Sequence, residues 1–229
     1  VGQTVTVHAW GDRFIAWFDP EGNLLSRSNP YSFTAEKSMV VRAVFAKELF
    51  TDIPEDAWYR EAAIEAAARG LIFGTSAFTF SASTPVTRAM SITMLFRASE
   101  EAAPGTDSVF TDVPEGVWFA DSVQWAVERK IVNGMGDGLF CPELNVTREQ
   151  FAVMLMRYAR YQGLELPTGL PHASDGDKIS PYAREAMGQA QCLGVIQGYP
   201  DGSLRPLAQV NRAEAVTMLL RLLELIETN

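Results

Sequence analysis

The sequence repeats itself three times between residues 50 and 221, and this repetition limits the fold more than any other feature. The segment FTDIPE at 50–55 returns as FTDVPE at 110–115, and all further matches between these two copies keep the offset of 60 residues. A third copy follows at an offset of 64, with Tyr182 in place of Trp118. Repeats of this length are small units that must stack to bury an apolar face. The first two copies share Trp58 and Trp118, Gly74 and Gly134, Phe80 and Phe140, Arg88 and Arg148, Met94 and Met154, and Arg97 and Arg157.

Each copy indicates two helices joined by a loop. In the second and third copies the loop carries a turn signal, Asp137-Gly138 and Asp201-Gly202. The first copy has Thr75-Ser76-Ala77 at this place, so its loop should differ in shape. The first helix of each copy is expected over about 58–69, 118–129 and 181–192.

The second helix of each copy has a readable start. Thr147 and Gln150 fit a capping box, in which each side chain bonds the backbone N–H of the other residue. Asn211 and Glu214 repeat the box with an asparagine cap, and Thr87 keeps only the cap. Apolar residues then recur at three- and four-residue spacing, and such stripes form a packed core. Two helices alone cannot bury their stripes, so we expect the three copies to pack together.

The first 46 residues follow a different pattern. Residues 4–10 alternate with a period of two, and further short runs rich in β-branched and aromatic residues are separated by turn signals. These runs predict a small β module over residues 1–46. Its Trp10, Phe14 and Trp17 should lie inside, because so short a domain needs its large apolar side chains in the core. The other expected strands are 14–18, 24–26, 31–34 and 39–45.

Composition excludes several functions. The net charge of −9 disfavours nucleic acid as a partner, and an anionic ligand would need a local positive site. No run of 18 apolar residues occurs, so no membrane insertion is expected. Cys141 and Cys192 lie at non-equivalent places of different copies and suggest no metal site, although a disulfide stays open. The chain opens at Val1 within the first strand pattern, and we expect it to be a fragment of a longer precursor.

The three copies resemble the S-layer homology (SLH) domain. The shared order is Phe-x-Asp-x-Pro, a Trp, a Gly-flanked loop with Asp-Gly-x-Phe-x-Pro, and Thr-Arg-(Ala/Glu)-(Glu/Gln) at a helix start. Copy 2 matches best, over Phe110–Arg157, and copy 3 matches through Gly198–Glu214. Copy 1 matches at Phe50–Trp58 and Thr87–Arg88. Each motif alone is modest, but three copies in register make the resemblance specific.

The resemblance implies a ligand and a set of contact residues. SLH domains bind secondary cell-wall polysaccharide, often with a pyruvate ketal on its terminal sugar, in grooves between lobes. In the family the arginine of the helix start contacts the anionic sugar, and the opening aspartate and nearby aromatic residues line the groove. The residues at the matching positions are Arg88, Arg148, Arg212, Asp52, Asp112, Trp58, Trp118 and Tyr182.

The resemblance also implies the fold. We expect a mainly α protein of three two-helix SLH lobes packed as a pseudo-threefold bundle, with a small β-grasp-like module before them. The order of motifs in residues 1–46, including Phe-x-x-Trp and Asn-Pro-Tyr-x-Phe, is similar to the divergent internalin B-type bacterial repeat. That likeness implies a spacer or an adhesin stalk. The SLH repeats are expected over 50–98, 110–160 and 172–226.

Elementary chemistry agrees with a ligand role for the arginines. Each follows a cap residue, where free backbone N–H groups and the positive end of the helix dipole favour an anion. A guanidinium adds directional contacts to a carboxylate. The alternative is an ion pair with the opening aspartate that fixes the loop. The register of the three copies favours ligand contact for Arg148 and Arg212.

The other candidates have structural alternatives. Trp58, Trp118 and Tyr182 could each offer a ring face to a sugar, but burial in the lobe core is the favoured interpretation. Asp52 and Asp112 are expected to brace a loop more than to touch sugar. The copies also depart from the family: Met90 replaces the usual glutamate in copy 1, and copy 3 has lost the Phe-x-Asp opening around 173–177. Because of these departures, not every groove between the lobes needs to bind the ligand.

Two functions remain open. The favoured one is non-catalytic anchoring at the extracellular cell wall, with the β module as a spacer to an upstream cargo domain outside this sequence. The alternative is an adhesion or protein-interaction fragment that uses the SLH lobes as a scaffold. A glycosidase would need a pair of carboxylates, and the sequence singles out no such pair among its scattered acidic residues. No enzyme activity, cofactor or metal is therefore expected.

Overall fold

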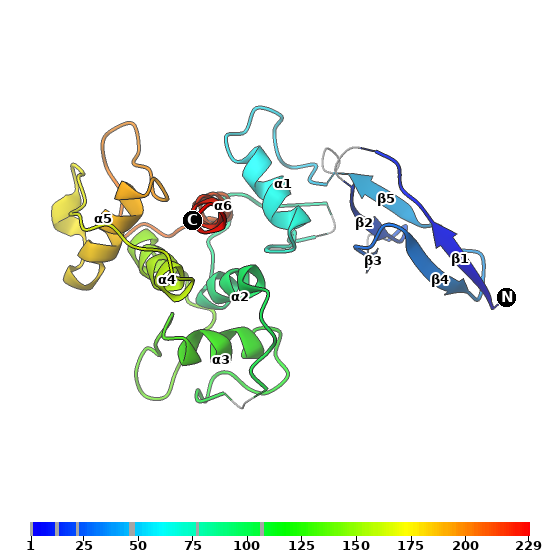
Figure 1. The fold of residues 1–229 in the computed structure, drawn as a ribbon, viewed down its shortest axis with the longest axis horizontal. Coiled ribbons are helices and arrows are strands. Elements are labelled where there is room, and N and C mark those ends of the chain that lie inside the picture. Colours follow the sequence, from blue (N-terminus) through cyan, green and yellow to red (C-terminus); the bar gives the residue numbers. More distant parts are fainter. Residues whose placement is uncertain (1, 12–13, 22, 46–48, 77, 106–107) are drawn as a thin grey trace. The chain divides into compact units, whose positions relative to one another are not determined.

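The computed structural model of this chain describes all residues except 1, 12–13, 22, 46–48, 77 and 106–107 (Figure 1). The described residues form five β-strands and six α-helices. The chain divides into two compact units, Val1–Ala82 and Ser83–Asn229. Four sequence-based expectations fall on residues outside the described part. These are the start at Val1, Gly22 in the turn signal between the strands expected at 14–18 and 24–26, the module boundary at residue 46 and the loop residue Ala77.

The strands of the first unit form two small antiparallel sheets (Figure 1). In one sheet β1 (Gln3–Val7) pairs with β4 (Tyr31–Ala35). In the other, the central β2 (Phe14–Phe18) pairs with β3 (Leu24–Ser26) and with β5 (Arg42–Phe45). The five expected strands are therefore confirmed, with ends that shift by a few residues. The core of the module lies on β2, where Ile15 to Phe18 are buried.

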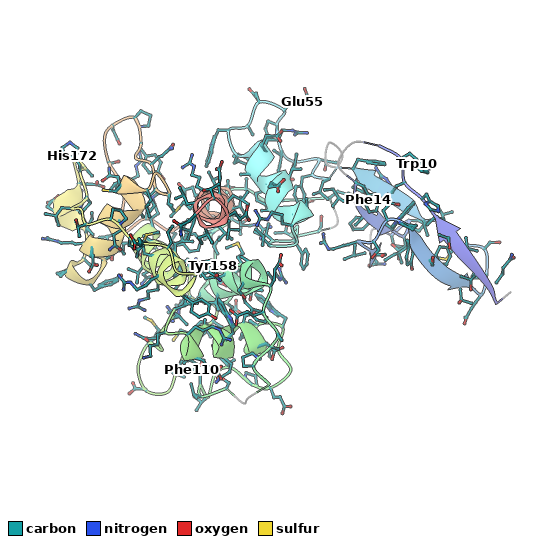
Figure 2. All side chains as sticks on the ribbon, in the orientation of Figure 1. Trp10, Phe14, Glu55, Phe110, Tyr158 and His172 are labelled. Atoms are coloured by element: carbon teal, nitrogen blue, oxygen red, sulfur yellow. The ribbon has the colours of Figure 1, made fainter. Side chains whose placement is uncertain are left out.

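Of the three aromatic residues expected inside the β module, one lies outside. Trp17 is buried and donates its indole N–H to the Ser28 carbonyl at 3.1 Å. Phe14 is half-buried, with its ring centroid 5.5 Å from that of Trp17. Trp10 is 87% exposed, so its expected burial is wrong (Figure 2). None of the strand residues of β1 or β4 is fully buried. Trp10, which follows β1, therefore has no core of this sheet to pack into.

The β module packs against the first half of repeat 1. The Phe18 ring lies 5.8 Å from the Phe78 ring, and the Arg42 guanidinium lies 5.1 Å above Phe78. Arg27 donates to the Ala67 carbonyl at 3.1 Å, near the end of α1 (Arg60–Ala68). These contacts explain why the strands and α1 belong to one compact unit. The predicted division between the β module and the first SLH repeat stays a prediction.

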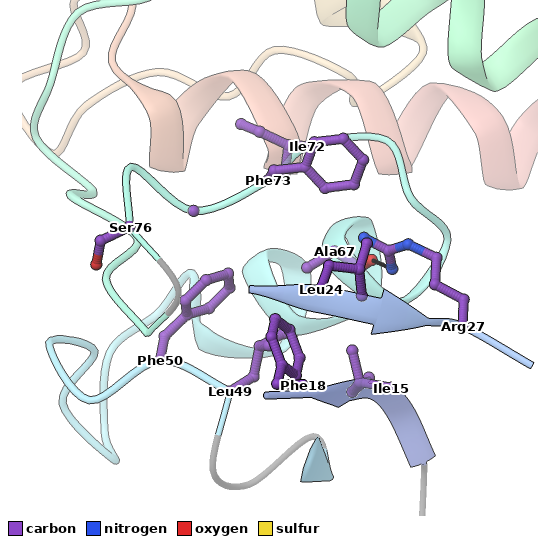
Figure 3. Close-up of a pocket in the computed structure, with 11 residues that line it drawn as sticks. Ile15, Phe18, Leu24, Arg27, Leu49, Phe50, Ala67, Ile72, Phe73 and Ser76 are labelled. Carbon is purple, nitrogen blue, oxygen red and sulfur yellow. Dashed lines mark hydrogen bonds between the residues drawn. The ribbon is translucent and has the colours of Figure 1, made fainter. Parts of the chain in front are cut away.

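A cavity of about 230 Å³ lies within this first unit (Figure 3). Apolar side chains from β2, from the segment before repeat 1 and from the loop after α1 make up most of its wall, and Arg27 is the charged residue in it. That guanidinium already bonds the Ala67 carbonyl and lies 4.8 Å above the Phe73 ring. Burial lowers the pKa of Arg27. The cavity is thus a packing gap whose one cation already has partners inside the protein.

In the second unit, the second helices of copies 1 and 2 each pack on the first helix of the next repeat (Figure 1). α2 (Arg88–Ser99) packs on α3 (Ala120–Glu128), and α4 (Arg148–Tyr161) packs on α5 (Arg184–Cys192). α6 (Arg212–Glu227) contacts both α2 and α4, which also contact each other. Two short 3-10 turns, η2 (Gly176–Lys178) and η3 (Pro181–Ala183), precede α5.

The starts of the second helices confirm the sequence-based prediction. Thr147 accepts a hydrogen bond from the Gln150 N–H at 3.3 Å, and the Gln150 side chain accepts one from the Thr147 N–H at 3.0 Å. Asn211 and Glu214 form the same reciprocal pair. Thr87 caps α2 alone. These caps depend on residues three apart, so sequence spacing suffices to find them.

A closed cycle of three backbone hydrogen bonds lies just before these helices. The Val86 N–H donates to the Val210 carbonyl, the Val210 N–H to the Val146 carbonyl, and the Val146 N–H to the Val86 carbonyl, at 2.9, 3.0 and 3.0 Å. All three valines are fully buried. The cycle needs one segment from every repeat, so no copy can form it alone.

The linker between copies 1 and 2 is tied to the helices through Glu101. Its carboxylate accepts hydrogen bonds from the Arg129 Nε at 2.9 Å and from the Tyr161 hydroxyl at 2.7 Å. The Arg129 guanidinium lies 5.6 Å above the Trp125 ring. Trp125 on α3 is buried against Tyr158 on α4, with ring centroids 6.2 Å apart.

The expected fold class is wrong. The described residues are 34% helical and 15% strand, so this is a mixed α and β protein and not a mainly α pseudo-threefold bundle. The division into units falls inside repeat 1, since the β module binds the first half of that repeat. The β-rich opening segment is therefore part of a compact unit with the first half of repeat 1, and its strands change the fold class.

Candidate functional site

The opening aspartate of every repeat braces the loop of that repeat. Asp112 accepts the backbone N–H of Phe140 at 2.8 Å and that of Cys141 at 2.6 Å. Asp52 and Asp175 each accept two N–H groups in the same way. The expected bracing contacts of Asp52 and Asp112 are thus present, and Asp175 shows that copy 3 keeps this feature of the opening. The other donors are Phe80 and Ser81 for Asp52, and Leu204 and Arg205 for Asp175.

The braced loops contain a residue with left-handed backbone geometry. Ser81, Cys141 and Arg205 have φ values of 57°, 59° and 49°. This conformation is costly for residues other than glycine. Each is the second of the two residues whose N–H groups bond the aspartate, so the carboxylate compensates for the strained turn. This gives the aspartates a structural role that a sugar contact does not explain.

The arginines at the starts of α2 and α4 reach into the loop of the next repeat. Arg88 of copy 1 donates from Nε to the Phe140 carbonyl and from Nη2 to the Asn133 carbonyl, both at 2.9 Å. Arg148 of copy 2 bonds the Leu204 carbonyl at 2.8 Å in the same way. Both side chains are buried, and so is that of Arg212. Burial lowers the pKa of Arg88, and the nearby acidic groups of Cys141 and Asp112 oppose this only in part.

The expected anion sites at the helix starts are occupied. The backbone N–H of Arg88 donates to the Leu144 carbonyl, that of Arg148 to Ala208 and that of Arg212 to Thr84, at 2.9 to 3.0 Å. The prediction that these N–H groups are free for a carboxylate is therefore wrong. Any anion at these places must be held by side chains.

A groove of about 280 Å³ lies beside Arg88, and we call it the Arg88 groove. α2, the loop before copy 2's Asp-Gly turn, α4 and the segment before α5 each contribute to its wall. Two guanidiniums, those of Arg88 and Arg157, line it, and no carboxylate is among its lining residues. This gives a local positive site in a chain of net charge −9. The other lining residues are Ile131, Val132, Asn133, Gly134, Met135, Gln150, Val153, Met154 and Tyr182.

Tyr182 is held at the wall of the Arg88 groove by Glu149. The Tyr182 hydroxyl donates to the Glu149 carboxylate at 3.0 Å, and the same carboxylate accepts from the Ser180 backbone and hydroxyl at 2.9 and 2.7 Å. Burial of the hydroxyl and its contact with Glu149 raise the pKa of Tyr182 to about 12. The phenol therefore stays protonated at neutral pH and remains a hydrogen-bond donor.

The aromatic candidates lie at the surface. Trp58, Trp118 and Tyr182 are 66%, 58% and 60% exposed, so the favoured interpretation as lobe core is wrong. They precede the first helices and do not start them, because the helices begin two residues later, as at Arg60 and Ala120. Exposure of a large aromatic ring leaves it available to a sugar.

The Arg88 groove brings together two of the eight predicted site residues. Arg88 and Tyr182 line it, whereas the rest are not among its lining residues. Sequence reasoning missed Arg157 as a candidate, although its register with Arg97 and Arg221 was a usable signal. The remaining predicted residues are Arg148, Arg212, Asp52, Asp112, Trp58 and Trp118.

Other kinds of site find no support in the described part of the chain. It contains no group of three or more His, Cys, Asp or Glu side chains that could hold a metal ion. Cys141 and Cys192 are both free thiols. Among the described residues, every helix is too short or too polar to cross a membrane.

The S-layer homology domain is the family whose model matches this chain, at residues 49–89, 109–152 and 174–216. These three matches cover more than half of the chain, and the chain belongs to this family. The match begins at residue 49, so the likeness of the β module to an internalin B-type repeat stays a prediction.

Several curated proteins share this region. An endoglucanase of Bacillus sp. (strain KSM-635) is 33% identical over 76% of this chain and 18% of its own length. An amylopullulanase of Thermoanaerobacterium thermosulfurigenes is 27% identical over 96% of this chain and 12% of its own. A cellulosome-anchoring protein of Acetivibrio thermocellus is 30% identical over 57% of this chain and 29% of its own length. The chain thus spans less than a third of each relative.

The relatives also agree with the expected location. They include proteins named as surface layer, cell surface and middle cell wall proteins. The family is thus one of the bacterial cell surface, and this chain is a cell-surface segment that serves in attachment to the wall.

Proposed function

We propose that this chain is a non-catalytic anchor that binds an anionic secondary cell-wall polysaccharide in the Arg88 groove. One observation carries the proposal: two guanidiniums line the groove, and no carboxylate does. The net negative charge of the chain repels polyanions at long range. A cationic groove in such a chain therefore indicates that it binds a specific anionic group at short range. A carboxylate such as a pyruvate ketal on a sugar has the required charge and size.

The groove is organised before a ligand arrives. Two backbone carbonyls fix the Arg88 guanidinium, and Arg157 donates to the Ile131 carbonyl at 3.4 Å. A guanidinium has five N–H donors, so both arginines keep donors for a carboxylate. The amides of Asn133 and Gln150 suit sugar hydroxyls. Fixed donors lose little conformational entropy on binding, which strengthens affinity.

The relatives support attachment as the shared role. Enzymes with different names, an endoglucanase and an amylopullulanase, match this chain over only 18% and 12% of their lengths. A segment shared by proteins of different activity serves a task other than catalysis. We propose that a longer protein carries this anchor beside a cargo domain, and that the β module over residues 1–46 is the spacer between them.

Sedimentation with cell wall tests this proposal. The chain should sediment with wall that retains its secondary polymer and stay in the supernatant with wall from which the polymer has been removed by acid. Arg157→Gln should weaken binding roughly 10- to 100-fold, as expected for lost hydrogen bonds to a charged group. Arg160→Gln is the matched control, because Arg160 is exposed on the same helix and does not line the groove.

Two results would contradict the proposal. Equal sedimentation with intact and stripped wall would show that the polymer is not the ligand, and would favour the adhesion alternative. Equal loss of binding in the Arg157→Gln and Arg160→Gln variants would show that charge alone, and not the groove, determines binding.

A further inference from the structure

The loop of copy 1 carries two aromatic rings that the loops of the other copies lack. Phe73 lies where copy 2 has Asn133, and Phe78 lies where copy 2 has Gly138, both at the offset of 60 residues. Copy 3 likewise has an amide and a glycine at these two places. The two rings are therefore particular to copy 1, and their contacts indicate what they do.

Backbone hydrogen bonds show that Phe78 and Gly138 occupy equivalent places. The Phe78 carbonyl accepts the Thr51 N–H at 2.9 Å, and the Gly138 carbonyl accepts the Thr111 N–H at 3.0 Å. Gly138 has a φ of 71°, a backbone conformation that is costly for a residue with a side chain. Copy 2 therefore has a turn without a side chain at the place where copy 1 presents a ring.

Each of the two rings lies under an arginine of the β module. The Arg27 guanidinium lies 4.8 Å from the centroid of the Phe73 ring, and the Arg42 guanidinium lies 5.1 Å from that of Phe78. The negative face of an aromatic ring attracts such a cation. The Phe18 ring also lies 5.8 Å from the Phe78 ring. An amide and a glycine offer no ring face, so the residues of copies 2 and 3 could not make these contacts.

The same stretch of loop faces a ligand groove in copy 2 and the β module in copy 1. Residues 132–134 of copy 2 line the Arg88 groove. Their equivalents, residues 72–74 of copy 1, line the cavity of the first unit, where Ile15 and Phe18 of β2 lie across from them (Figure 3). The loop positions that copy 2 offers to a ligand are thus taken up by the β module in copy 1.

The cavity beside the loop of copy 1 does not suit an anion. Arg27 is its charged residue, and this guanidinium is already engaged with the Ala67 carbonyl and the Phe73 ring. The Arg88 groove, in contrast, is lined by two guanidiniums, those of Arg88 and Arg157. Moving a carboxylate from water to apolar walls without a free cation is costly. An anionic sugar should therefore bind beside copy 2 and not in this cavity.

We infer that the loop of copy 1 is a docking surface for the β module and not a polymer site: Phe73 and Phe78 hold the module through Arg27 and Arg42. The statement about the polymer rests on the proposed function, whereas the statement about docking does not. Contacts at two separate rings restrict rotation of the module about either one. The module is then a spacer that leaves α1 in a fixed direction.

Giving the loop of copy 1 the residues of copy 2 tests the docking. The double variant Phe73→Asn with Phe78→Gly removes both rings, and Trp10→Gly is the control, because it removes an exposed ring of the same module. NMR relaxation measures the rotational correlation times of the amides in β1, β4 and α1. These times should agree in the unaltered chain and in the control. In the double variant the strand amides should have times at least about 1.5-fold shorter than those of α1, or the chemical shifts of unfolded chain.

The reverse exchange tests the assignment of the polymer to the loop of copy 2. Asn133→Phe puts a ring into the wall of the Arg88 groove and removes an amide, so binding to wall that retains its polymer should weaken at least about 10-fold. The double variant of copy 1 should change this binding less than about 2-fold, because neither of its residues lines the Arg88 groove. Sedimentation with cell wall measures both.

The possible failures are distinguishable. If the unaltered chain does not bind polymer-bearing wall, or if Asn133→Phe binds equally well with unchanged helical circular dichroism, the proposed function is wrong, and the relaxation data still decide the docking. If the double variant keeps equal correlation times and folded strand signals, the docking role of Phe73 and Phe78 is wrong. If the double variant loses as much wall binding as Asn133→Phe does, the loop of copy 1 binds polymer and the inference is wrong.

Discussion

The opening aspartates show how one residue can determine a loop. Asp112 has two oxygens, and each accepts a backbone N–H on either side of a turn that requires left-handed geometry. The repetition of this arrangement at Asp52 and Asp175 shows that it belongs to the repeat itself. The three aspartates share this role although the sequence around Asp175 has drifted.

Replacing Asp112 by Asn should destabilise the fold. The amide keeps one acceptor oxygen and turns the other into a donor that faces an N–H, so one charged hydrogen bond is lost and one contact becomes repulsive. We expect a loss of about 1–3 kcal/mol in the free energy of unfolding, measured by urea denaturation. Glu143→Gln, at an exposed loop residue, should change stability by less than about 0.5 kcal/mol. Equal effects of the two substitutions would show that the brace is not stabilising.

Glu149 acts as a positioning residue for Tyr182. Copies 1 and 3 have an alanine at its place, so this contact is particular to one groove. In a Glu149→Gln variant the pKa of Tyr182 should fall from about 12, because the nearby negative charge is gone, and stay above 10, because burial remains. Phenolate absorbance against pH, with Tyr182→Phe to identify the signal, measures this. An unchanged pKa would mean that Glu149 does not hold the hydroxyl.

At the scale of elements, the helix starts were predictable and the groove was not. A capping box involves residues three apart, so Thr147 and Gln150 reveal α4 without any tertiary knowledge. The partners of Arg88, in contrast, are the carbonyls of Phe140 and Asn133 in another repeat. Backbone carbonyls carry no sequence signature. Spacing could therefore identify Arg88 as a repeated residue but could not show what it contacts.

The Glu101 contacts couple the linker to α3 and α4 in a way that depends on pH. Partial burial alone would raise the pKa of Glu101, but hydrogen bonds from Arg129 and Tyr161 outweigh it and hold the pKa below its usual range. A carboxyl whose pKa is lowered by folding adds stability above its unfolded pKa, near 4.3, and loses it as the pH falls through the folded value. Glu101→Gln should therefore cost stability at pH 7.

The pH dependence distinguishes this contact from a general effect of charge. The difference in unfolding free energy between the unaltered chain and Glu101→Gln should shrink as the pH falls below about 4, measured by denaturation at several pH values. Glu165→Gln, at an exposed residue of the next linker, should show no such trend. A difference that stays constant with pH would mean that Glu101 stabilises the fold by shape alone.

At the scale of the whole molecule, the compact units do not follow the repeats. The β module and the first half of repeat 1 form one unit, whereas the second half of that repeat belongs with copies 2 and 3. The alternating pattern predicted the strands correctly, but it contained no sign that Phe18 and Arg42 would pack on Phe78. The fold class was wrong because strands in two antiparallel sheets accompany the helices. Repeat detection finds units of sequence, whereas contacts define units of structure.

Removing residues 1–48 should weaken what is left of the chain. Phe78 would lose its contacts with Phe18 and Arg42, and α1 would lose the hydrogen bond from Arg27. Exposure of one large apolar side chain costs about 2 kcal/mol, which corresponds to a fall in Tm of about 5 °C. Calorimetry of the truncated and full chains measures this. Trp10→Ser, at an exposed side chain, is the control and should leave Tm unchanged, and an unchanged Tm after truncation would show that the module is independent.

The contacts of Arg88 and Arg148 with the following repeat have a consequence for how such chains are recombined. Arg88 completes the loop of copy 2, and Arg148 completes the loop of copy 3. A transplant that cuts between repeats would therefore separate an arginine from the carbonyls it supports. A cut within a repeat, between its first and second helices, would keep the two together. The unit that keeps an arginine with its own carbonyls is then the junction between two neighbouring repeats. Hybrid anchors joined within repeats should therefore unfold at a higher temperature than hybrids joined between repeats.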